Sequence, residues 1–110
     1  MVPNASTYGT MIQNLLKEGS VEEAEHMFSL METSGCVPTS RLINNIIRML
    51  LKKGEIVKAG NYMSKVDGKG ISLEASTTSL LISLFSKNGK YHDQITSLPA
   101  KYQILDGFSL

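Results

Sequence analysis

The sequence predicts an all-α protein, an α-solenoid of antiparallel helix-turn-helix hairpins with a 35-residue period. Three observations predict this fold. Gly19, Gly54 and Gly89 recur in step (54 − 19 = 35 and 89 − 54 = 35), and each follows a lysine two positions earlier. Between these glycines, apolar residues recur at the three- and four-residue spacing of a helix. Individual apolar residues also recur 35 positions apart, as Leu15 and Leu50 do.

The first complete unit is expected over residues 5–39, and residues 1–4 are expected to be the tail of a preceding unit. Apolar spacing predicts a first helix from about Ser6 to Glu18. Gly19 can then take the left-handed conformation that ends a helix. The buried face of this helix would be Tyr8, Met11, Ile12, Leu15 and Leu16.

A second helix should follow directly in the same unit. Ser20 and Glu23 form a capping-box pattern, which marks a helix start. Gly35 is expected to stop this helix after about Ser34. Its buried face would be Val21, Ala24, Met27, Phe28 and Met31. Two helices joined by a tight glycine turn make a helical hairpin.

The second unit, residues 40–74, repeats the same plan. Its first helix would bury Ile43, Ile46, Ile47, Leu50 and Leu51. Its second helix would bury Ile56, Ala59, Tyr62, Met63 and Val66. Ala24 and Ala59 stand 35 apart (59 − 24 = 35), and a small side chain there would let the paired helices approach closely.

The third unit, residues 75–98, is predicted to be a degenerate capping repeat. Its first helix keeps the apolar pattern with Leu80, Leu81, Ile82, Leu84 and Phe85. Pro99 would interrupt the middle of a full second helix. We therefore expect a short helix from about Tyr91 to Leu98 and an irregular C-terminal tail over residues 99–110.

The net charge of +1 hides an uneven distribution. Taking residues 1–19, 40–54 and 75–89 as the first halves of the units, their charge is 6 − 1 = +5, which leaves 1 − 5 = −4 for the other halves. The basic residues of the first halves are Lys17, Arg41, Arg48, Lys52, Lys53 and Lys87. If the first helices line one surface, that surface is basic and the opposite one is acidic.

Several classes of protein are not expected. Cys36 is the only cysteine, so the chain can form no intramolecular disulfide and no thiolate metal cluster. The sequence has no phosphate-binding glycine loop, zinc-ligand spacing or nucleophile elbow, so we expect no enzyme, no cofactor and no metal. The apolar run from Leu42 to Leu51 is too short to span a membrane. The first twenty residues contain no arginine, and we expect no targeting peptide in this chain.

The segment from Thr7 to Pro38 resembles a pentatricopeptide repeat. The resemblance is carried by the runs Thr7-Tyr8-Gly9-Thr10-Met11-Ile12, Leu15-Leu16-Lys17-Glu18-Gly19-Ser20-Val21-Glu22-Glu23-Ala24 and Met31-Glu32-Thr33-Ser34-Gly35-Cys36-Val37-Pro38. It extends to the second unit and to the first half of the third. The chain is most similar to the plain class of such proteins, which is typical of plant organelles and includes fertility restorers.

This resemblance implies that the first helices bind single-stranded RNA, with about one base for each repeat. It assigns base reading to the residue after the tyrosine of the first helix together with the last residue of the repeat. The base-reading candidates are therefore Gly9 with Thr39, Asn44 with Glu74, and Ser79. The phosphate-contact candidates are Lys17, Lys52 and Lys87, with Arg48 on the same predicted face.

The function that the resemblance implies is single-stranded RNA binding within a longer repeat array. The chain would be a non-catalytic segment of an organellar RNA-processing or RNA-stabilising factor, located in the mitochondrion or, alternatively, in the chloroplast. Self-association through the exposed first helix is a further expectation. Two other hypotheses remain open, a protein-interaction scaffold of the tetratricopeptide type and a truncated fragment without independent function.

Overall fold

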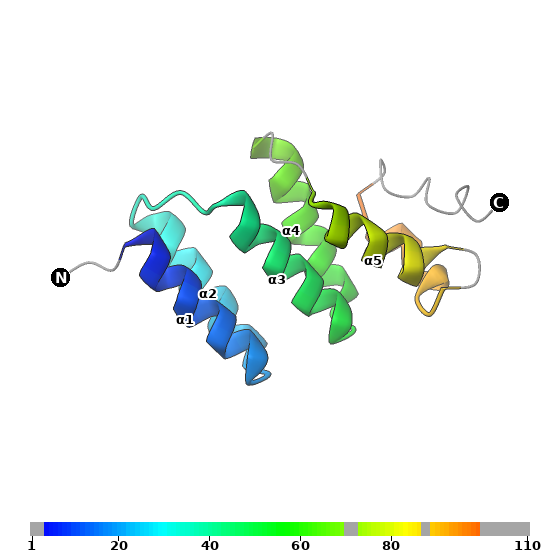
Figure 1. Cartoon of the computed structure of the whole chain (residues 1–110), viewed down its shortest axis with the longest axis horizontal. Helices are drawn as coiled ribbons and strands as arrows, with labels where there is room; N and C mark the ends of the chain where they lie inside the picture. Colours follow the sequence, from blue (N-terminus) through cyan, green and yellow to red (C-terminus); the bar gives the residue numbers. More distant parts are fainter. Residues whose placement is uncertain (1–3, 70–72, 87–88, 100–110) are drawn as a thin grey trace.

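Helical hairpins stacked in series make up the computed structural model, which describes residues 4–69, 73–86 and 89–99. Its elements, in order, are α1 (Ala5–Lys17), α2 (Val21–Thr33), α3 (Ser40–Lys52), α4 (Ile56–Lys69), α5 (Ala75–Phe85) and the 3₁₀-helix η1 (His92–Ser97). Helix α1 packs on α2 and α3 packs on α4, while α3 also contacts both α1 and α5. In Figure 1, α1, α3 and α5 form one layer, with α2 and α4 behind it. The predicted all-α solenoid of antiparallel hairpins is confirmed.

The same glycine turn closes the first helix of each of the two complete hairpins. Gly19 and Gly54 have φ values of 85° and 79°, in the left-handed region that glycine adopts without strain. The amide of Ser20 donates to the carbonyl of Leu15 at 2.8 Å, and the amide of Glu55 donates to that of Leu50 at 2.9 Å. These bonds satisfy carbonyls that a helix end leaves unpaired. The same backbone turn therefore recurs 35 residues apart, at Gly19 and at Gly54.

The starts of α1 and α3 are capped by the residue that ends the preceding unit, whereas the start of α2 differs from the sequence prediction. The Asn4 side chain accepts from the amide of Thr7 at 2.8 Å, and the Thr39 hydroxyl accepts from that of Leu42 at 3.1 Å. The capping box predicted at Ser20 and Glu23 is wrong, because Ser20 makes no side-chain capping bond. Its ψ of 65° departs from the extended backbone that directs a capping side chain toward the helix.

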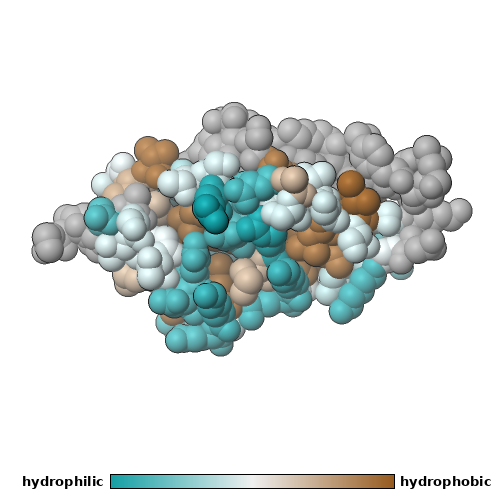
Figure 2. Space-filling model, viewed as in Figure 1, coloured by the Kyte–Doolittle hydropathy of each residue, from teal (hydrophilic) through white to brown (hydrophobic). Residues whose placement is uncertain are grey.

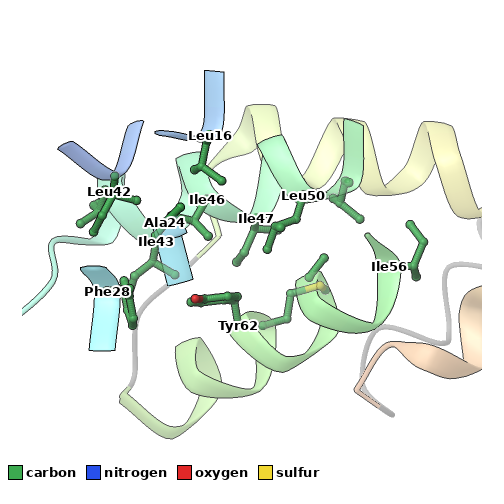
Figure 3. Close-up of a cluster of buried hydrophobic side chains, with 14 of the residues drawn as sticks. Leu16, Ala24, Phe28, Leu42, Ile43, Ile46, Ile47, Leu50, Ile56 and Tyr62 are labelled. Carbon is green, nitrogen blue, oxygen red and sulfur yellow. The ribbon is translucent and has the colours of Figure 1, made fainter. Parts of the chain in front are cut away.

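The core lies between the helix layers, and most of the predicted buried faces are confirmed. Figure 3 shows its central part, including Leu16, Ile47 and Leu50, each at most 1% exposed. Ala24 and Ala59 are buried as predicted, at 2% and 0% exposure. Met11 differs, since it is 39% exposed and lines an open groove of the first hairpin.

The third unit is shorter than the two before it. Its second element, η1, is a single 3₁₀ segment that packs on both α5 and α4. Gly60 of α4 allows this contact, because a Cβ atom there would clash with the carbonyl oxygen of Ser97. Leu98 follows η1 and is buried, at 3% exposure. None of the helices in the described part of the chain is long and apolar enough to cross a membrane.

Three sequence predictions fall on parts that the structure does not describe. The predicted phosphate contact Lys87 lies outside the described residues. Residues 1–3 of the predicted N-terminal tail lie outside them as well. The predicted C-terminal tail is described only at Pro99.

Candidate nucleic-acid interface

Two adjacent hollows lie along the surface formed by α1 and α3, which we call the α1–α3 face. The first, the reader hollow, has a volume of about 460 Å³. It is lined by Ser6, Gly9, Thr10, Gln13, Met31, Thr39, Arg41 and Leu42. The second, the cationic hollow, has a volume of about 260 Å³ and is lined by Gln13, Lys17, Asn45, Arg48, Met49 and Lys52. Gln13 belongs to both, so the two hollows adjoin.

The reader hollow brings together Gly9 and Thr39, the first predicted base-reading pair. Gly9 has no side chain and so leaves space on α1. A Cβ atom at this position would lie 3.8 Å from the nearest atom of Leu42, which is an ordinary contact distance. The hydroxyl of Thr39 is occupied in capping α3. Its position is therefore fixed by the start of the helix that it caps.

The cationic hollow brings together Lys17 and Lys52, two of the predicted phosphate contacts. Each is the last residue of its helix and precedes the same glycine turn, so the repeat geometry places the two side chains in register. Both are exposed, and neither ammonium group has an ion-pair partner within the part of the chain that the structure describes. Two unpaired cations beside the amide groups of Gln13 and Asn45 suit a phosphate, which accepts hydrogen bonds from both kinds of group.

Arg48 lines the same hollow, but α5 already engages its guanidinium. This group donates to the Glu74 carboxylate at 2.9 Å and to the hydroxyls of Ser76 and Thr77 at 2.8 and 3.0 Å. It also donates to the side-chain oxygen of Asn45. A phosphate at Arg48 would therefore compete with the Glu74 carboxylate for the guanidinium.

Asn44 and Glu74, the second predicted reading pair, are adjacent but form part of the junction between α3 and α5. The Asn44 side chain is fully buried, at 0% exposure. Its oxygen accepts from the backbone amide of Glu74 and from the hydroxyl of Thr77, both at 2.8 Å. Its nitrogen donates to the carbonyl of Ser40 at 2.8 Å. Reading a base with Asn44 would require the amide to exchange these bonds.

Ser79, the last base-reading candidate, is exposed on α5 and lines neither hollow. Sequence reasoning missed Gln13 and Asn45, although helical spacing carried the signal. Gln13 stands four residues after Gly9 and four before Lys17, so the three residues share one face of α1.

Helix α4 carries two lysines that, unlike Lys17 and Lys52, form ion pairs with glutamates of α2. Lys58 pairs with Glu25 at 3.2 Å, and Lys65 pairs with Glu32 at 3.3 Å. The hydrogen bond with Glu25 raises the pKa of Lys58 above its ordinary value. Lys65 also lies 5.7 Å from the centre of the Phe28 ring. Lys58 and Lys65 are thus matched by acidic partners, while Lys17 and Lys52 remain available to a ligand.

The polar character of the α1–α3 face is visible in Figure 2, where hydrophilic residues gather over α3 and around the lower ends of α1 and α3. Among the described residues, no group of three histidine, cysteine, aspartate or glutamate side chains could hold a metal ion. The chemistry that this face offers is electrostatic and hydrogen-bonding.

Two comparisons with known proteins bear on the repeat architecture. Residues 3–41 match the PPR repeat family. The chain is 47% identical over 68 residues to "Protein Rf1, mitochondrial" of Oryza sativa subsp. indica. This alignment covers 62% of the chain and 8% of that protein, so the chain spans a small part of its relative's length. Together with the 35-residue hairpin period, these matches support a protein of the pentatricopeptide repeat type.

Proposed function

We propose that the chain is a non-catalytic, single-stranded RNA-binding segment of a mitochondrial RNA-processing or RNA-stabilising factor. The observation that carries this proposal is the pair of unpaired lysines, Lys17 and Lys52, in one hollow of the α1–α3 face. The name of the relative, a mitochondrial protein, supports the location. Family resemblance supports RNA as the ligand.

The two hollows suggest how a strand would lie on the face. Lys17 and Lys52 would contact phosphates, and a base next to them would enter the reader hollow beside Gly9 and Thr39. Gln13 lines both hollows, so its amide could contact either the base or the backbone. A single strand suits this arrangement, because only an unpaired base can turn its edge toward a protein side chain.

Base selection is expected to differ between the two complete units. The pair Gly9 and Thr39 borders an open hollow, whereas Asn44 and Glu74 make hydrogen bonds to neighbouring helices. Binding at Asn44 would have to offset the loss of those bonds, each of which contributes about 0.5–1.5 kcal/mol net. We therefore propose that the first unit contributes more base contact than the second.

The energy available to this segment is modest. A stacked base contributes about 1–3 kcal/mol, before the cost of ordering the strand. With about three bases in contact, the segment would bind weakly alone and would act within a longer array. Occupying a stretch of RNA in this way blocks nucleases or prevents RNA pairing, and neither effect needs a catalytic group.

The test compares a labelled single-stranded RNA with a duplex RNA of the same length, by fluorescence anisotropy at low salt. We expect the chain to prefer the single strand, and Lys17→Gln with Lys52→Gln to weaken binding by about tenfold, since two charged contacts are lost. Lys65→Gln is the matched control, because it removes the same charge from α4. Equal binding of both RNAs, or an equal loss in the control, would contradict the proposal.

A further inference from the structure

Arg48 stands at the border between the cationic hollow and helix α5. Its side chain lines the hollow together with Lys17 and Lys52. Unlike those lysines, it is only 20% exposed, and its guanidinium donates to the Glu74 carboxylate at 2.9 Å. The hollow therefore contains a third cation whose charge is already paired within the protein.

The equivalent positions of the first unit are uncharged. Gln13 stands 35 residues before Arg48 (48 − 13 = 35), and Thr39 stands 35 before Glu74 (74 − 39 = 35). The second unit thus has a cation and an anion where the first unit has two neutral side chains, and the two charged groups bind each other. At the position of a bound phosphate, the opposite charges of such a pair largely cancel.

The backbone holds Glu74 in place independently of this ion pair. The Glu74 amide donates to the Asn44 side chain at 2.8 Å, and the Glu74 carbonyl accepts from the amide of Thr78 at 3.0 Å. Because these two bonds fix the start of α5, the carboxylate stays beside the hollow when the guanidinium moves away. A phosphate that took Arg48 would therefore leave an unpaired carboxylate close to its own negative charge, which is unfavourable.

Two hydroxyl groups add to the contacts that hold Arg48 on α5. Ser76 and Thr77 accept from the guanidinium at 2.8 and 3.0 Å. Hydrogen bonds are directional, so these contacts orient the guanidinium toward α5. A phosphate in the cationic hollow thus meets two unpaired lysines and one arginine that is already bound.

We propose that Glu74 limits the affinity of the second unit for single-stranded RNA, by occupying the guanidinium that a phosphate would otherwise bind. The second unit then neutralises phosphate through Lys52, and Arg48 becomes a phosphate contact only when the carboxylate is removed. This inference rests on the proposed function of the α1–α3 face. It gives Glu74 a role in setting the strength of binding, which is separate from the choice of base.

The test is Glu74→Gln, which removes the charge and keeps the shape of the side chain. Circular dichroism checks that the variant folds. Binding of a labelled single-stranded RNA of mixed sequence is followed by fluorescence anisotropy over a series of salt concentrations. We expect the variant to bind about threefold more tightly at low salt. Its plot of log affinity against log salt should be steeper by about 0.7, because one more phosphate is neutralised.

Two further variants separate the release of Arg48 from a general effect of charge. Glu25→Gln is the matched control, because Glu25 is also partly exposed, pairs with Lys58 at 3.2 Å and lines neither hollow. It removes the same charge and should leave the slope unchanged. Adding Arg48→Gln to Glu74→Gln should abolish the increase in slope, because no guanidinium is then left to bind a phosphate.

Three results would overturn the inference while leaving the proposed function intact. These are RNA binding with an unchanged slope in Glu74→Gln, an equal change of slope in Glu25→Gln, or an increase in slope that persists when Arg48 is also replaced. Absence of RNA binding by both the unsubstituted chain and Glu74→Gln would contradict the proposed function, and this inference with it.

Discussion

The two junctions that join successive units differ in chemistry, although the repeat plan is the same. The junction between the first and second hairpins is apolar at its centre, where Phe28 meets Tyr62 (Figure 3). Its lysine–glutamate pairs lie at the partly exposed edge. The junction between α3 and α5 instead contains a polar network, in which Asn44 and Thr77 are buried and Arg48 and Glu74 are partly exposed.

This difference shows that the start of α5 is held in another way than the starts of α1 and α3. Glutamate is a poor N-cap, and the Glu74 side chain makes no capping bond to α5. Asn44 and Arg48 of the preceding unit hold this helix start instead. A polar network fixes one geometry, because each group has specific partners, whereas an apolar contact tolerates sliding. The second junction therefore sets the direction of α5 through a few side chains.

The largest effect is expected from breaking the apolar junction with Phe28→Ala. Phe28 is 1% exposed and packs against Tyr62. Removing its ring should lower the free energy of unfolding by about 3–5 kcal/mol, through lost burial and a residual cavity. Urea unfolding followed by circular dichroism measures this change. A loss below about 1 kcal/mol would show that the junction is held by other contacts.

The polar junction should respond strongly and more locally to Asn44→Ala. The substitution leaves the amide of Glu74 and the hydroxyl of Thr77 without their acceptor. We expect a loss of about 2–3 kcal/mol, since unsatisfied buried groups are costly. Hydrogen exchange should accelerate at the Thr78 amide, which donates to the carbonyl of Glu74 at the start of α5, while α1 and α2 stay protected. Uniform acceleration along the chain would contradict a local role.

The dependence of stability on alkaline pH should report on the junction between the first and second hairpins, because that junction contains Tyr62. Burial raises the pKa of Tyr62 well above its ordinary value, and the charges of Glu25 and Glu32 add to this shift. Above about pH 10, the unfolded chain releases the phenolic proton that the folded protein keeps, so the free energy of unfolding should fall by about 1.4 kcal/mol per pH unit from this group.

Tyr62→Phe should remove this part of the decline, because phenylalanine has no proton to release. Urea unfolding of both proteins, at neutral pH and at several values above about pH 10, measures the difference. Parallel declines in the two proteins would rule out Tyr62 as the source.

The smallest effect is expected at the edge of the apolar junction. Lys65→Gln breaks the ion pair with Glu32 and the contact with the Phe28 ring. Because the lysine is partly exposed, we expect a loss of about 0–1 kcal/mol, which salt should reduce further. Thermal unfolding at low and high salt measures it. A larger loss of stability would show that the edge of this junction is one of the main contributors to its stability.

The apolar junction was largely predictable from the sequence, and the polar one was not. Glycine turns and apolar spacing are local signals, so the period and most buried residues could be read directly. Asn44 was predicted as a base reader because the family resemblance assigns that role to its position in the first helix of the repeat. Its partner Thr77 lies 33 residues away, and sequence spacing does not show that the two side chains meet.

The candidate site was predictable to a similar extent. Lys17 and Lys52 share a hollow as expected, because each precedes the same turn at the same step. The engagement of Arg48 by Glu74 depends on how α5 crosses α3, which no local pattern specifies. The base-reading roles of Gly9, Thr39, Asn44, Glu74 and Ser79 stay predictions, as do the phosphate contacts of Lys17, Lys52, Lys87 and Arg48.

The salt dependence of RNA affinity tests the central claim most directly, namely that the lysines of the first helices neutralise phosphates. For three such lysines, Lys17, Lys52 and Lys87, a plot of log affinity against log salt should have a slope of about −0.7 × 3, or −2. Lys17→Gln and Lys52→Gln should each bring the slope to about −1.4, and the double variant to about −0.7, while Lys65→Gln should leave it at about −2. A slope that the two substitutions on the α1–α3 face leave unchanged would contradict the claim.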